Sequence, residues 1–200
     1  MAIRSTTFAA CIALAVALPA FAVAPGTAAP DFTVNDTSGK SIKLSDYRGK
    51  FVVLEWTNPE CPFVGKHYTS KNMQDLQKEW GGKGVVWLTI NSTNAAHSEY
   101  KTPNEMASWM RGQGGAPKAT LIDGTSGTAR AYEAKATPHM FVIDPIGKIV
   151  YNGAIDDKRS TSLDDVKTAN NYVRAALTEA MTGKPVTTAS TAPYGCSLKY

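Results

Sequence analysis

The stretch "EWTNPECPFVGKH", residues 55–67, contains the side chain best suited to covalent chemistry, the thiol of Cys61. Pro62 follows it, and proline is typical of the first position of a helix. The unpaired backbone N–H groups and the positive end of the helix dipole at such a start stabilise a thiolate. We therefore interpret Cys61 as a reactive thiol in preference to a small buried residue.

Two positions near Cys61 qualify this interpretation. Many dithiol redox sites have a second cysteine three residues after the first, but here that position is Val64. Glu55 interrupts the apolar run "FVVLEW". Burial would raise the pKa of this carboxyl and make Glu55 a candidate proton acceptor for the thiol. A solvent-facing Glu55 at the strand end fits the sequence equally well.

The N-terminus accounts for one of the three cysteines. Residues 1–22 combine an early positive charge, an apolar run and Ala20-Phe21-Ala22, which predicts a signal peptide cleaved after Ala22. The mature chain would then be periplasmic or otherwise exported, with no segment inserted in a membrane. Removal of Cys11 leaves Cys61 and Cys196, a candidate pair in an oxidising compartment.

Cys196 lies 13 residues after Gly183, the glycine that ends the last predicted helix. An extended tail of that length reaches ~40 Å, enough to cross a domain of this size. Reach therefore permits a bond to Cys61 within one chain. Pairing with another chain and a purely structural disulfide are also compatible with the sequence.

Composition excludes several other classes of protein. The chain has 200 residues, a net charge of +4 and 43% hydrophobic residues, which is typical of a globular domain. Its basic residues are spread along the chain, so a nucleic-acid partner is not expected. The sequence has no paired C-x-x-C motif, so a zinc site is not expected, and no motif indicates a cofactor. The sequence does not fix the oligomeric state.

Hydrophobic periodicity predicts an α/β domain over residues 31–182, after a linker at 23–30 and before a tail at 183–200. A β-hairpin opens the domain. Buried strands are expected at "FVVLEW", "GVVWLTINS", "ATLID", "ATPHMFVID" and "IVYNG". Helices are expected at 62–80, at "TPNEMASWMRGQGG" with Thr102 as its cap, and at "GTARAYEA". A last helix is expected from Ser162 to residue 182, with Ser162 and Asp165 as the capping pair at its start. This order is typical of the thioredoxin fold.

Three segments resemble one known family. They are "APDFTVNDTSGKSIKLSDYRGKFVVLEWTNPECPF", "ATPHMFVIDPIGKIVYNG" and "GKPVTTASTAPYGCSLKY". Together they resemble redoxins, the peroxiredoxin-like (alkyl hydroperoxide reductase and thiol-specific antioxidant) branch of the thioredoxin superfamily. The resemblance implies a thioredoxin fold, here with a central mixed sheet flanked by helices, an N-terminal β-hairpin and an extended C-terminal tail.

The resemblance also assigns roles to individual residues. Cys61 falls on the reactive cysteine, Glu55 on a buried proton acceptor, and Pro138 on a cis-proline that faces the thiol. Thr137, Pro62 and Asn58 support this site. Asn58 stands where typical peroxiredoxins have Thr or Ser, and Leu54 stands where they have Pro. Typical peroxiredoxins also carry an Arg near the strand start that stabilises the peroxide, and here that slot looks like Pro138. Without hydrogen-bond donors to the peroxide oxygens the transition state is less stabilised, so weak peroxidase activity is expected.

The main hypothesis is an exported thiol-disulfide or peroxide oxidoreductase. Cys61 attacks, Cys196 resolves the intermediate and Glu55 assists proton transfer. The substrate would be a redox partner protein, a small thiol or a peroxide. One alternative is a copper-binding or metallochaperone module with Cys61, Cys196, His139 and Met140 as ligands. A second is a redox-inactive binding domain with a structural disulfide.

Overall fold

A five-stranded mixed sheet forms the centre of the molecule. The computed structural model describes residues 23–200, and the predicted signal peptide, residues 1–22, lies outside the described residues. The strand order is β5-β4-β3-β7-β8, with β3, β4 and β5 parallel and β7 and β8 antiparallel to their neighbours. The strands are β3 (Val52–Trp56), β4 (Val86–Asn91), β5 (Ala119–Ile122), β7 (His139–Ile143) and β8 (Ile149–Gly153). The predicted α/β class and thioredoxin fold are confirmed.

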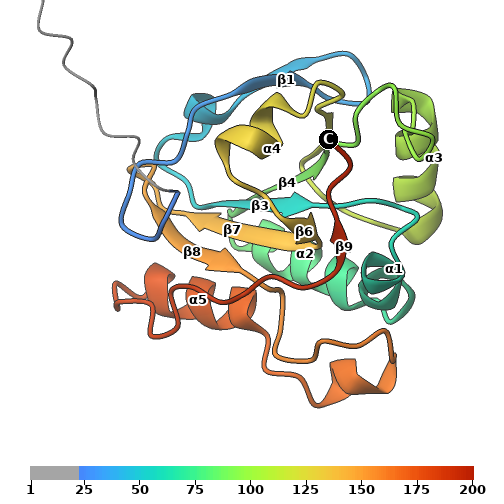
Figure 1. Ribbon diagram of the computed structural model, residues 1–200. Helices are drawn as coiled ribbons and strands as arrows, with labels where there is room; N and C mark the ends of the chain where they lie inside the picture. The colour runs from blue at the N-terminus through green and yellow to red at the C-terminus, as the bar shows by residue number, and fades with distance from the viewer. Residues whose placement is uncertain (1–22) are drawn as a thin grey trace, which may run out of the picture.

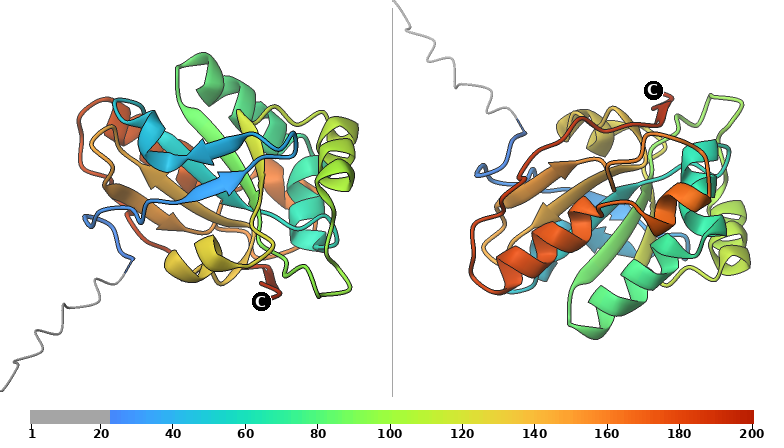
Figure 2. Two further views of the ribbon diagram at one scale, coloured as in Figure 1. Left: turned by 90° about the horizontal axis from the view of Figure 1, so that it is seen from above. Right: turned by 90° about the horizontal axis from the view of Figure 1, so that it is seen from below.

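Helices and a hairpin cover the two faces of the sheet (Figures 1 and 2). The elements around the sheet are β1 (Thr33–Asn35), β2 (Ser41–Lys43), α1 (Pro62–Thr69), α2 (Asn72–Gly82), α3 (Pro103–Gln113), α4 (Gly127–Ala131) and α5 (Tyr172–Met181). Helices α1, α2 and α5 pack on one face in a core that includes Val53. The hairpin and α4 pack on the other face in a core that includes Leu54. This division follows from the alternation of side chains along β3.

Several local predictions are confirmed. Strands β1 and β2 form an antiparallel hairpin in which Val34 lies opposite Ile42. Helix α3 begins at Pro103, and its N-cap Thr102 accepts a hydrogen bond from the backbone of Glu105, whose side chain bonds back to the cap. This is the capping box that stabilises helix starts.

The single helix predicted over 62–80 is wrong, because the chain forms α1 and α2 with a break between them. Lys71 has a φ of 65°, a left-handed conformation that ends one helix and starts the next. The apolar pattern did not reveal the break, since Tyr68 before it and Met73 after it are both fully buried.

The predicted start of the last helix is also wrong. Residues Asp164–Lys167 form a 3-10 turn, and α5 begins after Asn171, whose side chain accepts a 2.8 Å hydrogen bond from Arg174 N. The predicted cap, Ser162, precedes this turn. Asn171 ranks with Ser as an N-cap, so composition alone did not distinguish the two positions.

Both ends of the described chain pack against the sheet. In the predicted linker, Ala29 N donates to Gly147 O at 2.9 Å. The tail runs past β8 and ends in β9 (Cys196–Ser197), which pairs antiparallel with the short strand β6 (Ala136–Thr137), as Figure 1 shows. Within residues 23–200, no helix combines the length and apolar character needed to cross a bilayer.

Candidate active site

The loop between β3 and α1 presents Cys61. The cysteine is the N-cap residue of α1, and Pro62 occupies the first helical position as expected. Cys61 N donates to Asn58 O at 3.0 Å, and the side-chain oxygen of Asn58 accepts from Glu60 N at 3.0 Å. Asn58 therefore shapes the turn that places the sulfur at the helix start. Only 2% of Cys61 is exposed.

The junction between β6 and β7 lies against Cys61. Its thiol donates a 3.0 Å hydrogen bond to the carbonyl oxygen of Thr137, and the peptide bond between Thr137 and Pro138 is cis. Pairing of β3 with β7 sets Trp56 opposite His139, which brings this junction to the same edge of the sheet as the end of β3. The structure thus brings Cys61, Thr137 and Pro138 together.

Cys196 reaches the same place from the far end of the chain. In the pairing of β6 with β9 it lies opposite Thr137, the residue whose carbonyl contacts Cys61. Neither thiol is in a disulfide. Burial is the largest cause that raises the pKa of Cys196 to about 12. The hydrogen bond that its thiol donates to the Cys61 sulfur and the charge of that sulfur raise this pKa further. Cys196 is therefore protonated at neutral pH while Cys61 remains unmodified.

Glu55 is fully buried on the α1 side of the sheet, which excludes the solvent-facing alternative. Its carboxylate accepts hydrogen bonds from four side chains: Tyr68 at 2.8 Å, Gln77 at 3.1 Å, Trp87 at 2.7 Å and Thr89 at 3.1 Å. Burial outweighs these bonds and raises its pKa to about 7. Glu55 can exchange a proton near neutral pH, but its hydrogen-bond donors are these four residues rather than Cys61.

The four predicted copper ligands are not brought together. Met140 belongs to the core on the α1 face. The ring of His139 instead lies tilted against Phe141, part of the opposite core, at 4.6 Å between ring centroids. Adjacent residues of a strand face opposite sides, so His139 points away from the sulfurs. Among residues 23–200, no three His, Cys, Asp or Glu side chains form a possible metal site.

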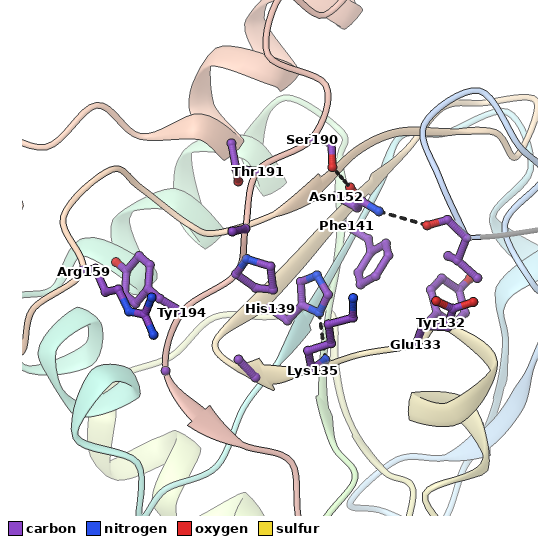
Figure 3. A pocket seen from close by; sticks show the side chains of 15 residues that line it. Tyr132, Glu133, Lys135, His139, Phe141, Asn152, Arg159, Ser190, Thr191 and Tyr194 are labelled. Atoms are coloured by element: carbon purple, nitrogen blue, oxygen red, sulfur yellow. Dashed lines mark hydrogen bonds between the residues drawn. The ribbon is translucent and has the colours of Figure 1, made fainter.

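His139 faces a pocket of about 650 Å³ beside the tail (Figure 3). Its Nδ1 accepts a 3.2 Å hydrogen bond from Lys135 N, and Tyr194 and Arg159 lie at one end of the pocket. The residues that line this pocket include neither Cys61 nor Cys196, so the thiol site lies outside it.

Sequence reasoning missed a cluster of buried polar residues next to the two thiols. Tyr194 in the tail contacts Lys66 and His67 of α1 and Asp156 after β8. Lysine and aspartate are usually exposed and histidine is intermediate, so their types gave no sign of burial. The only available signal was that Tyr194 precedes Cys196 by two residues.

Comparison with known proteins finds a redoxin family and a thiol-disulfide oxidoreductase among the similar sequences. The sequence pattern of the AhpC/TSA family matches residues 25–152. The thiol-disulfide oxidoreductase ResA of Bacillus subtilis (strain 168) is 30% identical over 128 residues, which cover 64% of this chain and 66% of ResA. The chain thus matches just under two thirds of the length of that relative.

Two solved structures are similar over a longer part of the chain. A conserved protein from Geobacillus kaustophilus superposes with a TM-score of 0.76 at 28% identity, covering 88% of this chain and 92% of that one. A protein from Sinorhizobium meliloti 1021 gives 0.75 at 25% identity, covering 88% and 94%. A Chlorobium tepidum protein described as a DsbE-type thiol:disulfide interchange protein gives 0.51 at 25% identity, covering 64% and 83%.

Proposed function

Because the chain belongs to the AhpC/TSA family, we propose that it is a thiol-disulfide oxidoreductase with Cys61 as nucleophile and Cys196 as resolving cysteine. The observation that supports this most strongly is the pairing of β9 with β6. It sets Cys196 opposite Thr137, whose carbonyl oxygen lies 3.0 Å from the Cys61 sulfur. A second thiol is therefore available where a mixed disulfide on Cys61 would form.

The proposed reaction has two thiol exchanges. The Cys61 thiolate attacks a substrate disulfide, forms a mixed disulfide and releases one substrate thiolate. Cys196 then loses its proton and attacks the Cys61 sulfur. This forms the Cys61–Cys196 disulfide and releases the second substrate thiolate. The substrate gains two electrons, the protein loses two, and the reverse sequence would oxidise a dithiol.

The order of attack has an electrostatic basis. Two of the causes that raise the pKa of Cys196, a hydrogen bond to Cys61 and the negative charge on Cys61, disappear when the Cys61 sulfur enters a mixed disulfide. Cys196 is then easier to ionise, so it becomes a nucleophile only at the second step. Glu55, with its pKa raised to about 7, supplies a proton acceptor on the same side of the sheet.

Disulfide exchange is favoured over peroxide reduction by the contacts of Asn58. Its side-chain nitrogen donates to Glu99 at 2.8 Å, and its oxygen accepts from Glu60 N at 3.0 Å. The amide oxygen and one of the two amide N–H groups thus hold the loop, which leaves the side chain at most one donor for a peroxide oxygen. The names of the ResA and DsbE-type relatives also support disulfide exchange with a redox partner protein.

Export belongs to the same proposal. The N-terminal sequence up to Ala22 has the features of a signal peptide, and an exported thiol pair would meet partners that carry disulfides. Mass measurement of the protein recovered from the periplasm of an expression host tests this. Export predicts a mature chain that begins at Val23, whereas an uncleaved chain retained in the cytoplasm would contradict it.

A trapping experiment tests the chemistry. Cys196→Ser should accumulate a mixed disulfide with a disulfide-bonded protein substrate, Cys61→Ser should form none, and the wild-type chain should form the Cys61–Cys196 bond. Absence of a trapped adduct in Cys196→Ser would contradict the proposal. The reduction potential separates catalysis from a structural disulfide, because structural bonds have potentials below about −300 mV.

A further inference from the structure

The tail carries a buried aromatic residue that the proposed reaction does not use. Tyr194 is 4% exposed and lies among three other buried polar side chains, Lys66, His67 and Asp156, which are 0–2% exposed. We call these four residues the tail cluster. Burial of charged groups is costly unless they are paired and hydrogen-bonded, so such a cluster requires close mutual contacts.

The hydroxyl group of Tyr194 is the centre of the tail cluster. It donates a hydrogen bond to Asp156 Oδ1 and accepts one from Lys66 Nζ at 3.3 Å. It also lies 3.3 Å from Nε2 of His67. Burial and the charge of Lys66 lower the pKa of His67 to about 3, so the imidazole is neutral. With the Asn72 side-chain nitrogen on its Nδ1, the ring proton lies on Nε2 and points to Tyr194.

The ring of Tyr194 is held as firmly as its hydroxyl. Phe63 packs edge-on against it at 5.8 Å between ring centroids, and Lys66 Nζ lies 5.2 Å from the ring centre. All these contacts come from α1, whose N-cap is Cys61, or from the loop after β8. Tyr194 therefore fixes the tail to the helix that presents the nucleophile.

Gly195 joins this anchor to Cys196. A Cβ added to Gly195 would lie 2.0 Å from the carbonyl oxygen of Thr137, so the tail backbone passes directly against the residue that contacts Cys61. Tyr194 and Cys196 also pack in the same core as Cys61. A single residue, Gly195, thus separates the buried anchor from the second thiol.

From these contacts we infer that Tyr194 is a positioning residue for Cys196, holding it against Cys61 before the disulfide forms. The inference rests on the proposed function and adds the group that sets how readily the internal disulfide forms. Without the hydroxyl, Asp156 Oδ1 keeps only its 3.0 Å bond from Lys158 N, and Asp156 Oδ2 has no hydrogen-bond partner among the described residues. Water would then compete for Asp156. In the reduced protein, where no disulfide holds Cys196, the tail would be free to detach from α1.

The test is the equilibrium between the full mature chain and dithiothreitol, with the disulfide fraction measured by thiol alkylation and mass. We expect Tyr194→Phe to lower the constant for forming the Cys61–Cys196 bond about tenfold, because the variant removes the hydrogen bond from Tyr194 to the buried carboxylate of Asp156. A tenfold change corresponds to about 30 mV for this two-electron couple. If Tyr194 contributed only to the global stability of the domain, this constant would not change.

Tyr132→Phe is the matched control. Its hydroxyl makes a 2.8 Å bond to the distant Pro30 O from within the core on the opposite face of the sheet, so it should leave the constant within twofold. Equal constants for the two variants would overturn the positioning role. If Tyr194→Phe fails to fold, Asp156→Asn replaces it, with about a threefold decrease expected and an unchanged constant overturning the inference. A wild-type chain that forms no internal disulfide would instead refute the proposed function.

Discussion

The two cysteines lie in segments that are held in very different ways. Cys61 follows β3, a five-residue strand paired on both sides and buried along its whole length. Cys196 lies on β9, a two-residue strand paired on one side only. The tail around it is held by the tail cluster and by contacts of the last residues, such as the bond from Asn94 N to Lys199 O. The position of Cys61 is therefore a property of the paired strands of the sheet, whereas the position of Cys196 depends on the fewer contacts that the tail makes with the surface of the core.

This contrast has a thermodynamic consequence. Loss of the contacts around β3 removes core structure and should unfold the domain. Loss of the contacts around β9 should free the tail and leave the sheet intact, because local openings have their own free energies. Substitutions near β3 should mainly change global stability, and substitutions in the tail should mainly change the thiol equilibrium.

The largest effect is expected on the β3 side. Glu55→Ala removes the acceptor for four buried side-chain donors. The free energy of unfolding should fall by about 4 kcal/mol or more, since each buried donor without a partner costs about 1–3 kcal/mol. Denaturant unfolding at pH 7 measures this. Glu60→Ala, next to Cys61 but at an exposed ion pair with Lys101, should change stability by less than about 1 kcal/mol; equal effects would remove the distinction between core and surface carboxylates.

The second prediction uses the pH dependence of the same residue. Burial raises the pKa of Glu55 to about 7 from an ordinary value of 4.5, so the folded chain keeps this proton over a range in which the unfolded chain has lost it. The contribution of Glu55 to stability is therefore greatest below pH 4.5 and falls as pH rises to 7, by roughly 3 kcal/mol at about 1.4 kcal/mol per pKa unit.

Glu55→Gln cannot titrate, so this fall should be absent from its stability curve. Unfolding of both proteins between pH 4 and pH 8 provides the comparison, and the difference between the curves isolates Glu55 from other titrating groups. Parallel curves would mean that the carboxyl does not retain its proton near neutral pH. Glu55 would then no longer be a suitable proton acceptor for the thiols.

The same contrast explains what could be predicted from the sequence. The sheet and the location of Cys61 at a helix start follow from continuous apolar runs and from Pro62, both of which are local signals. The burial of Glu55 could not be predicted, because its hydrogen-bond donors come from α1, α2 and β4. Those elements meet only once the fold has formed.

For the tail, the sequence predicted only that its length allows Cys196 to reach Cys61. A two-residue strand such as β9 has no hydrophobic period, and its partner β6 is equally short. The tail cluster combines residues from three separate segments whose types usually lie on the surface, so neither composition nor spacing indicated that Tyr194 is buried. Contacts of this kind require the three-dimensional arrangement.

A third prediction concerns the closest approach of the tail to the site. Gly195→Ala places a Cβ 2.0 Å from Thr137 O at a residue with a φ of 138°, so β9 should separate from β6. Strain of about 1–3 kcal/mol lowers the constant for the internal disulfide by up to roughly 100-fold. Gly183→Ala, with positive φ and no atom within 4 Å of the added Cβ, is the matched control and should leave the constant unchanged.

The unfolding free energy of the reduced protein completes this test. Both glycine variants should lose similar, small amounts, because the core around β3 is untouched. If Gly195→Ala unfolds the domain as strongly as Glu55→Ala, the tail is part of the main core. The contrast between the two cysteine segments would then fail.

The smallest effect is expected at the end of the tail. Lys199 Nζ lies 3.6 Å from Glu99 Oε1, and both side chains are about one third exposed. Such pairs contribute about 0–1 kcal/mol and weaken with salt. Lys199→Gln also retains the 2.8 Å bond from Asn94 N to the carbonyl of residue 199. The constant for the internal disulfide, measured against dithiothreitol at low and high salt, should therefore change by less than threefold. A tenfold decrease that disappears at high salt would show that surface charge, rather than the buried contacts of Tyr194, holds the second thiol in place.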